Sequence, residues 1–354
     1  MRNGTHALVQ IDGSHGEGGG ALVRTALLMS ALTLQPARIN EVRGASKFPG
    51  LDAEDLTLLR ALASIVGAET VGAEIGSHSV SFLPNRKPLG YKGEIKSERN
   101  DSKRGANALV VLNSLLPVLA RSGVYSSLVA EGETFGSNAL SYDYFANVTI
   151  PALKHAGIYA FPDLIRAGFG RESSGQVALD VEPSPIRGIE WTDRGGLRGI
   201  KAVITTTGFP ASVAERIASH LTRLAQNSGL KMRIEGHEVE GAGRGAFVTA
   251  WAHYDKGMGG GTAMTAGGIR PEVIAQQAFE EMFDWMSSSA TTDPYLADQL
   301  ILPLALAETG SNFTVSRITQ RFLTSVWVIK QFLPIHITVR GAENGPGTVT
   351  ILRG

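Results

Sequence analysis

The sequence predicts an α/β fold of the α+β type, with a large domain of three repeated α/β units and a smaller inserted α/β domain. Strand-like and helix-like patterns alternate in an order that recurs about every 90 residues. A segment that does not follow this order separates the second repeat from the third. The 42 glycines are spread along the 354 residues, as expected for many tight turns. We therefore expect residues 1–185 and 269–354 to form the large domain and residues 186–268 to form the insert.

The first unit is predicted to begin with a strand at 7–11, a glycine-rich turn and a helix at 21–34 with one buried stripe. A strand at 40–43 follows, and then a helix at 52–66 with Asp52 as its N-cap. The same alternation predicts the remaining strands at 70–71, 79–83, 93–95, 126–130, 177–181, 334–339 and 348–352. Further helices are expected at 107–120, 141–156 (interrupted near Pro151), 271–286 and 296–307.

The insert is predicted to contain one helix, at 210–225, and strands at 201–206, 231–235 and 246–253. Pro183 opens this segment and a glycine-rich run from Gly257 closes it. We interpret both ends as loops, which is where domain insertions are tolerated.

Composition indicates an ordinary soluble protein, with 43% hydrophobic and 19% charged residues. The 33 basic and 33 acidic residues cancel, so any contact with a nucleic acid should be local. The absence of cysteine excludes disulfides, thiolate metal sites and a cysteine nucleophile. We expect no signal peptide, no membrane span and a cytoplasmic location.

The first motif is the run from Gly16 to Gly20 between the first strand and the first helix. Glycines let backbone N–H groups approach an oxyanion, and the helix N-terminus adds partial positive charge, although such a run is often only a turn. It is neither a P-loop nor a dinucleotide fingerprint. Glu17, at the helix start, could hold a divalent metal beside a phosphate. Arg24 and Arg43 could converge on that phosphate, or each could be a solvated arginine.

A second motif lies on one predicted helical turn, which carries Tyr295, Asp298 and Gln299. An aromatic ring, a carboxylate and an amide could together hold a purine. The alternative interpretation is a helix N-terminus with an ordinary polar face.

These segments resemble the RNA 3'-terminal phosphate cyclases. The similarity covers nearly the whole chain and is strongest at Asp12-Gly-Ser-His-Gly-Glu-Gly-Gly-Gly and Tyr295-Leu-Ala-Asp-Gln. It implies use of ATP and Mg²⁺ (or Mn²⁺) to convert an RNA 3'-phosphate into a 2',3'-cyclic phosphate through an adenylated histidine. By resemblance, Glu17 is the metal ligand and Arg24 and Arg43 hold the phosphate. The nucleotide site is implied to include Tyr295, Asp298, Gln299 and Asn113.

Several positions depart from the family pattern. Arg321 stands where the family has its nucleophilic histidine, and a guanidinium cannot take that role. Glu54 and Asp55 replace a glutamine–histidine pair, and Arg171 begins a changed turn. Ala21 and Asn113 each replace a glutamine.

Two hypotheses follow from these departures. In the first, the protein is an active cyclase in which either another group accepts AMP or AMP is transferred directly. In the second, it is a non-catalytic relative that binds RNA ends, a nucleotide or a protein partner. A transferase of the enolpyruvyl type, built from comparable repeats, is a more remote alternative. The oligomeric state is not predicted.

Overall fold

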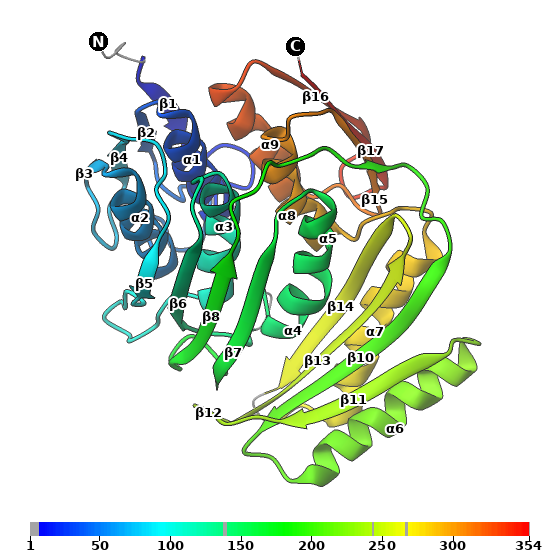
Figure 1. The fold of residues 1–354 in the computed structure, drawn as a ribbon. Coiled ribbons are helices and arrows are strands. Elements are labelled where there is room, and N and C mark those ends of the chain that lie inside the picture. Colours follow the sequence, from blue (N-terminus) through cyan, green and yellow to red (C-terminus); the bar gives the residue numbers. More distant parts are fainter. Residues whose placement is uncertain (1–6, 137–139, 243, 266–267, 354) are drawn as a thin grey trace.

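The computed structural model describes residues 7–136, 140–242, 244–265 and 268–353. The first unit runs in the order β1 (Val9–Asp12), α1 (Gly20–Thr33), β2 (Ala37–Asn40), α2 (Ala53–Val66), β3 (Glu69–Val71) and β4 (Ser79–Leu83). Its sheet has the strand order β1-β2-β4-β3 (Figure 1). The first pair is parallel and the other two are antiparallel.

The other two units repeat this connectivity. The second contains β5 (Lys92–Ile95), α3 (Ala108–Ala120), β6 (Ser126–Gly132), the helical segment α4, η1 and α5 (Tyr142–Tyr144, Phe145–Thr149, Ile150–His155), β7 (Ala160–Gly168) and β8 (Gly175–Val181). The third contains β9 (Glu190–Trp191), α8 (Pro294–Ala305), β15 (Ser311–Val315), α9 (Gln320–Phe332), β16 (Ile335–Gly341) and β17 (Gly347–Arg353). Each has one parallel pair followed by two antiparallel pairs, in the orders β5-β6-β8-β7 and β9-β15-β17-β16. The predicted threefold repeat is confirmed.

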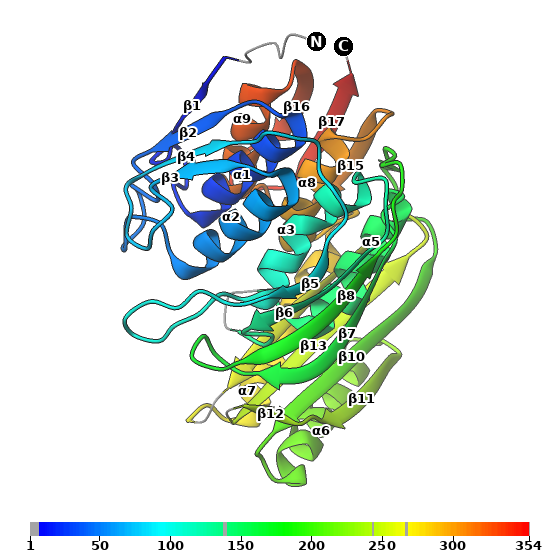
Figure 2. The same cartoon turned by 60° about the vertical axis from the view of Figure 1, so that its left-hand side comes forward.

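The segment between β9 and α8 builds a separate sheet. This segment of the chain contains β10 (Leu197–Thr207), α6 (Ala211–Asn227), β11 (Met232–Glu238), β12 (Gly241–Ala242), β13 (Gly245–Tyr254), β14 (Gly257–Thr265) and α7 (Pro271–Ser287). The sheet order is β11-β10-β13-β14, and α6 and α7 contact each other and the sheet (Figure 2). Apolar residues of α6 and α7 share one core with this sheet. The helix expected at 271–286 therefore packs on the smaller sheet, while the boundaries at 186 and 268 stay predictions.

Two expected elements are wrong for local reasons. The strand expected at 40–43 lies earlier, at Ala37–Asn40, because Glu41 and Arg43 adopt positive φ angles of 49° and 54°, which extended chain cannot continue. The run from Gly257 is strand β14 and not a closing loop. A methyl group at Gly261 would lie 2.3 Å from the backbone oxygen of Ala278, so these glycines allow α7 to pack against the strand.

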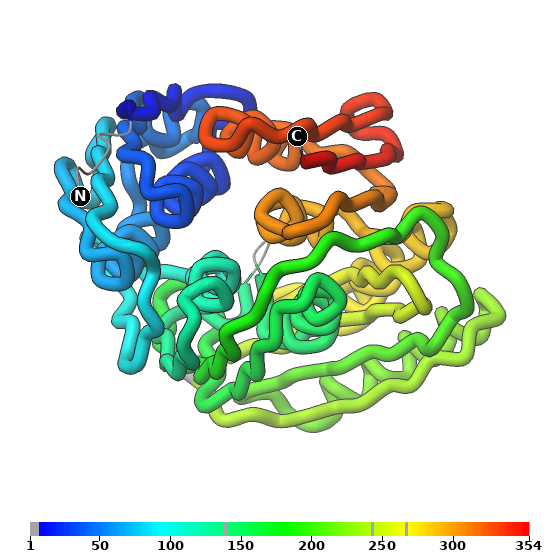
Figure 3. The backbone as a smooth tube through the Cα atoms, turned by 45° about the horizontal axis from the view of Figure 1, so that its top comes forward, coloured from blue at the N-terminus to red at the C-terminus, as the bar shows by residue number. Residues whose placement is uncertain are grey.

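The helices of the three units lie together inside a ring of sheets, as the end-on view shows (Figure 3). Helix α1 contacts α2, α3 and α9, and α8 contacts α9. The N-termini of α1, α8 and α9 thereby approach one another. Across the residues that the structure describes, we find no helix with the length and apolar character needed to span a bilayer.

Candidate active site

A cavity of about 980 Å³ lies between the helices of the large domain and the sheet of the insert. Its insert side includes Phe247 on β13, Gly260 on β14 and Glu281 on α7. Every residue that the sequence assigned to the site lines this cavity: Glu17, Arg24, Arg43, Asn113, Tyr295, Asp298, Gln299 and Arg321. Residues more than 300 positions apart in the chain are thus brought to one place.

The glycine-rich loop is fixed against α9. Gly16 has a φ of 60°, and a methyl group there would lie 2.3 Å from the Thr324 hydroxyl oxygen. The next backbone N–H, that of Glu17, donates to the same hydroxyl at 3.0 Å. A side chain at Gly16 would therefore separate the loop from the helix, and Glu17 is held beside the first turn of α9.

Glu17 pairs with Arg321. The Nη2 atom of Arg321 donates to Glu17 Oε1 at 3.2 Å, and Nε lies 3.3 Å from both carboxylate oxygens. The side chain of Arg321 is 47% exposed and that of Glu17 is 30% exposed, so solvent reaches the pair. The guanidinium keeps its charge and has no acceptor atom. Arg321 therefore contributes charge and hydrogen bonds to the cavity but no nucleophile.

The turn at the start of α8 presents the predicted nucleotide-binding group. Tyr295 is 41% exposed, so one part of its ring is open for contact. The Gln299 side-chain oxygen accepts from Thr149 at 2.5 Å, while Asp298 accepts from the hydroxyl of Thr319 at 3.3 Å. Thr319 is also the N-cap of α9. The carboxyl of Asp298 thus joins α8 to the helix that carries Arg321.

Burial gives Asp298 a pKa near neutrality. Loss of hydration raises the pKa of this carboxyl to about 7. The nearby Arg321 guanidinium has the opposite effect and lowers the pKa, but burial is the larger effect. The negative charge of Glu17 acts in the same direction as burial. Asp298 can therefore hold or release a proton near pH 7, which is the property of a general acid or base.

Arg24 and Arg43 meet the carboxylates at the start of α2. Arg24 Nη1 lies 2.8 Å from Glu54 Oε1 and 3.2 Å from Asp55 Oδ1. Arg43 Nη1 lies 3.1 Å from Asp55 Oδ2. The alternative interpretation, in which each is a solvated arginine, is wrong, because both lie within a largely buried network of ion pairs.

Asp52 and Arg171 complete this group. Asp52 Oδ2 accepts from Arg43 at 2.7 Å, while its Oδ1 caps α2 as predicted, by accepting from the backbone N–H of Asp55 at 2.9 Å. Arg171 Nη2 lies 3.5 Å from Glu54 Oε2. We call these residues the buried charge cluster; its members are Arg24, Arg43, Arg171, Asp52, Glu54 and Asp55. Its three arginines face three carboxyl groups, so the cluster has no excess positive charge when all three are ionised.

Two carboxyls in and behind the cluster have raised pKa values. Burial, assisted by the charge of Asp52, raises the pKa of Asp55 to about 7 in spite of Arg24 and Arg43. Burial also raises the pKa of Glu133 to about 7, opposed by the hydrogen bond from Asn107. The Nδ2 atom of Asn107 donates to Glu133 Oε2 at 3.2 Å, and the Asn107 backbone N–H donates to Glu54 at 3.2 Å.

The arrangement does not fit a divalent metal at Glu17 as it stands. Both oxygens of Glu17 face Arg321, and no group of three histidine or acidic side chains in the described part of the chain could hold an ion. A Mg²⁺ ion there would need its other ligands from substrate phosphates and water. His15, in the glycine-rich loop, stacks on Trp327 with ring centroids 3.8 Å apart.

Sequence reasoning missed several cavity residues. Arg171 lies in a turn after β7, far in sequence from the carboxylates that it meets, and no spacing indicates that contact. The acidic residues Glu280, Glu281 and Asp284 line the cavity from α7, which was expected elsewhere. Helical periodicity in α7 marks a common face for these side chains, but only the packing of α7 on β14 shows where that face lies.

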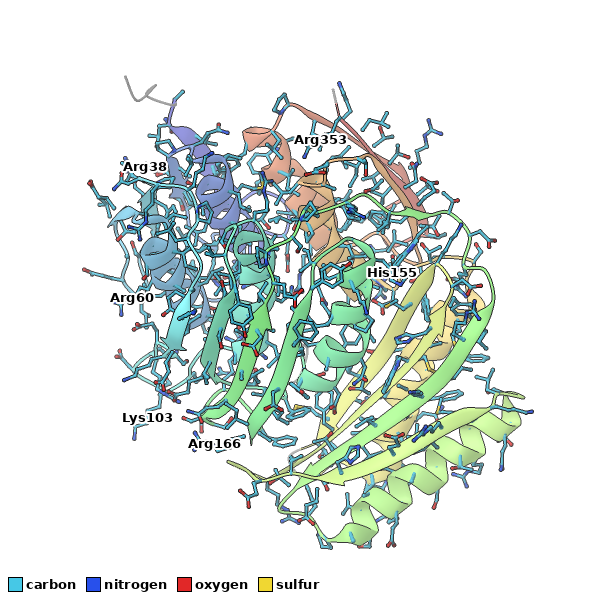
Figure 4. All side chains as sticks on the ribbon, viewed as in Figure 1. Arg38, Arg60, Lys103, His155, Arg166 and Arg353 are labelled. Atoms are coloured by element: carbon cyan, nitrogen blue, oxygen red, sulfur yellow. The ribbon has the colours of Figure 1, made fainter. Side chains whose placement is uncertain are left out.

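Basic residues outside the cavity are dispersed. Arg38 on β2, Arg60 on α2 and Arg166 on β7 follow the outer edge of the molecule in Figure 4, well separated from one another. These three arginines therefore do not form one basic patch.

Comparison with known proteins gives consistent matches. A sequence profile described as "RNA 3'-terminal phosphate cyclase" matches residues 15–339. The RNA 3'-terminal phosphate cyclase of Methylococcus capsulatus is 33% identical over 348 residues, which cover 97% of this chain and 96% of that protein. The protein of the same name from Thermococcus gammatolerans is 34% identical over 350 residues, 98% of each chain.

One solved structure is also similar in part. The enolpyruvyl transferase NikO from Streptomyces tendae matches with a TM-score of 0.28 and 16% identity. The match covers 49% of this chain and 33% of the other, and at that score it supports no conclusion about fold or function.

Proposed function

Because the chain belongs to the RNA 3'-terminal phosphate cyclase family, we propose that it converts the 3'-phosphate of an RNA end into a 2',3'-cyclic phosphate with ATP as second substrate. The observation that carries this proposal is the single cavity lined by all of the predicted nucleotide and phosphate residues. We further propose that the protein works in the cytoplasm and contacts RNA mainly through its end.

ATP would give AMP to the terminal phosphate with release of pyrophosphate, and the neighbouring 2'-hydroxyl would then displace AMP and lose its proton. Since Arg321 cannot accept AMP, we propose direct transfer to the RNA phosphate without an adenylated protein. Activation then depends on holding two anionic substrates in register, which is a positioning task.

The residues of α8 and α9 would hold the nucleotide. The exposed ring of Tyr295 supplies a stacking face, and the side chains of Gln299 and Asn113 supply polar contacts at the cavity wall. Arg321 would release Glu17 and pair with the nucleotide's phosphates, because a guanidinium suits an anion that presents two oxygens. Asp298, with its pKa of about 7, would take the proton from the 2'-hydroxyl.

Arg24 and Arg43 would hold the RNA phosphate. Their Nη1 atoms both lie within 3.2 Å of one carboxylate, so their spacing suits an anion with several oxygens. The role of Glu17 as a metal ligand stays a prediction, and no step of the proposed reaction depends on it.

The proposal is tested by incubating the protein with ATP, Mg²⁺ and an oligoribonucleotide that carries a 3'-phosphate. Formation of a phosphatase-resistant cyclic end that requires ATP is the expected result. Arg43→Ala should abolish most of the product. Glu131→Gln, which removes a carboxylate paired with Arg99 outside the cavity, should leave the rate unchanged. ATP-dependent product that persists undiminished in Arg43→Ala, or no product from the unmodified protein, would contradict the proposal.

A further inference from the structure

We propose that Asp55 is a specificity-determining residue, which lies behind the cavity wall, pairs with the two arginines of the proposed anion site and weakens the binding of a doubly charged terminal phosphate. The inference rests on the proposed function in taking an RNA phosphate as the ligand of Arg24 and Arg43.

The first support is the position of the Asp55 carboxylate between the two arginines. Its Oδ1 lies 3.2 Å from Arg24 Nη1, and its Oδ2 lies 3.1 Å from Arg43 Nη1. The side chain is fully buried, with 0% exposed. Each carboxylate oxygen thus takes one guanidinium donor, as two oxygens of a bound phosphate would.

The second support is the N-terminus of α1. This helix begins at Gly20, its cap Gly19 makes no side-chain bond to it, and its first turn contains no acidic residue. A methyl group on Gly20 would lie 3.2 Å from Asp55 Oδ1 and 2.7 Å from Arg24 Nη1. Asp55 therefore supplies the negative charge at the positive end of α1, which is the place where the sequence predicts an external anion.

The third support is the charge balance of the buried charge cluster. Asp52 and Glu54 flank Asp55 and bond the same arginines, so a phosphate would add negative charge where the positive charge is already matched. Arg43 Nε is buried and has no hydrogen-bond partner in the described part of the structure. A phosphate would thus find one unused donor and would take over the others from Asp55.

The consequence is a competition between an internal and an external anion. Like charges that are forced together in a site cost several kcal/mol, so removal of one of them should strengthen phosphate binding by about tenfold or more. A 3'-hydroxyl end brings no such charge and should bind equally well with or without Asp55.

The experiment measures binding by fluorescence anisotropy of two labelled oligoribonucleotides of one sequence, one ending in a 3'-phosphate and one in a 3'-hydroxyl. Asp55→Asn keeps the shape of the side chain and removes its charge. We expect this variant to bind the 3'-phosphate oligonucleotide about tenfold more tightly than the unmodified protein. Binding of the 3'-hydroxyl oligonucleotide should not change. Glu131→Gln, which removes one charge outside the cavity, should bind both oligonucleotides as the unmodified protein does.

The inference is overturned if Asp55→Asn leaves the 3'-phosphate affinity unchanged or lowers it, or if both oligonucleotides gain affinity equally. If Asp55→Asn does not fold, Asp52→Asn gives the same test, because asparagine keeps the cap on α2 and removes the charge next to Arg43. A selective gain of about threefold is then expected, and no selective gain overturns the inference. Cyclisation assayed on the same samples separates the two claims: a selective gain in binding without cyclic product contradicts the proposed function alone.

Discussion

Four members of the buried charge cluster, Arg24, Arg43, Arg171 and Glu54, line the same cavity as the Glu17–Arg321 pair, yet the two groups hold their charges in different surroundings. In the cluster, the carboxylates of Asp55 and Glu54 at its centre are 0% and 5% exposed, while Arg171 and Asp52 at its edge are 33% and 26% exposed. In the pair, Glu17 is 30% and Arg321 47% exposed. Paired charges that lack water depend on each other, whereas charges that solvent reaches can separate at little cost. The comparison teaches that the side of the cavity formed by the cluster is built into the fold, whereas the side formed by Glu17 and Arg321 can rearrange; we propose that these two sides hold the RNA end and the nucleotide, respectively.

Arg24→Ala should give the largest effect on stability. It leaves Glu54 and Asp55 buried without one of their partners, which typically costs about 3 kcal/mol or more in the free energy of unfolding. Urea unfolding measures this change. Arg321→Ala is the matched comparison and should lie within about 1 kcal/mol of the unmodified protein. Equal losses in the two variants would remove the distinction between the two regions.

Asp298→Asn should change how stability depends on pH. Burial raises the pKa of Asp298 to about 7 from its ordinary value of 3.8, so the folded protein keeps a proton that the unfolded chain releases. The free energy of unfolding therefore falls as pH rises from about 4 to about 7. Asp298→Asn should remove up to about 4 kcal/mol of this fall, because each unit of pKa difference corresponds to about 1.4 kcal/mol.

Urea unfolding at the two ends of that pH range tests the Asp298 prediction. Asp101→Asn, at an exposed loop position, serves as the control. Asp55 and Glu133 also lower the free energy of unfolding as pH rises, so the Asp298 variant should keep part of the slope of stability against pH. An identical slope in the Asp298 variant and the unmodified protein would show that this carboxyl titrates normally.

Arg321→Ala should lower the affinity for ATP by about tenfold, since it removes one charge-assisted contact to phosphate. Calorimetric titration of ATP measures the change, and Arg198→Ala, which removes an exposed arginine outside the cavity lining, is the control. Unchanged ATP affinity in Arg321→Ala would contradict a phosphate-binding role for this residue.

Sequence reasoning succeeds where the interaction is local. The Asp52 cap acts within three residues, and the side chains of Tyr295, Asp298 and Gln299 share a face because the helical period places them there. The threefold repeat followed from element order alone. These features depend on neighbouring residues or on patterns that the chain repeats.

The rest requires packing that no local pattern specifies. Arg24 meets Asp55 only because α1 lies against α2, and Arg171 joins them from a turn in the second unit. In the sequence the glycines of β14 suggest a loop, but in the structure they belong to a strand whose backbone packs closely against α7. A sequence shows which charges exist, but the fold decides which of them are already paired.

The most direct measurement is to incubate the protein with Mg²⁺, 3'-phosphate RNA and ATP labelled on the α-phosphate, and then to denature it and follow the label. Direct transfer predicts that the label ends in free AMP while cyclic RNA ends accumulate, and that the denatured protein carries none. Stable label on the protein would contradict this account, because it would show that a side chain other than Arg321 accepts AMP.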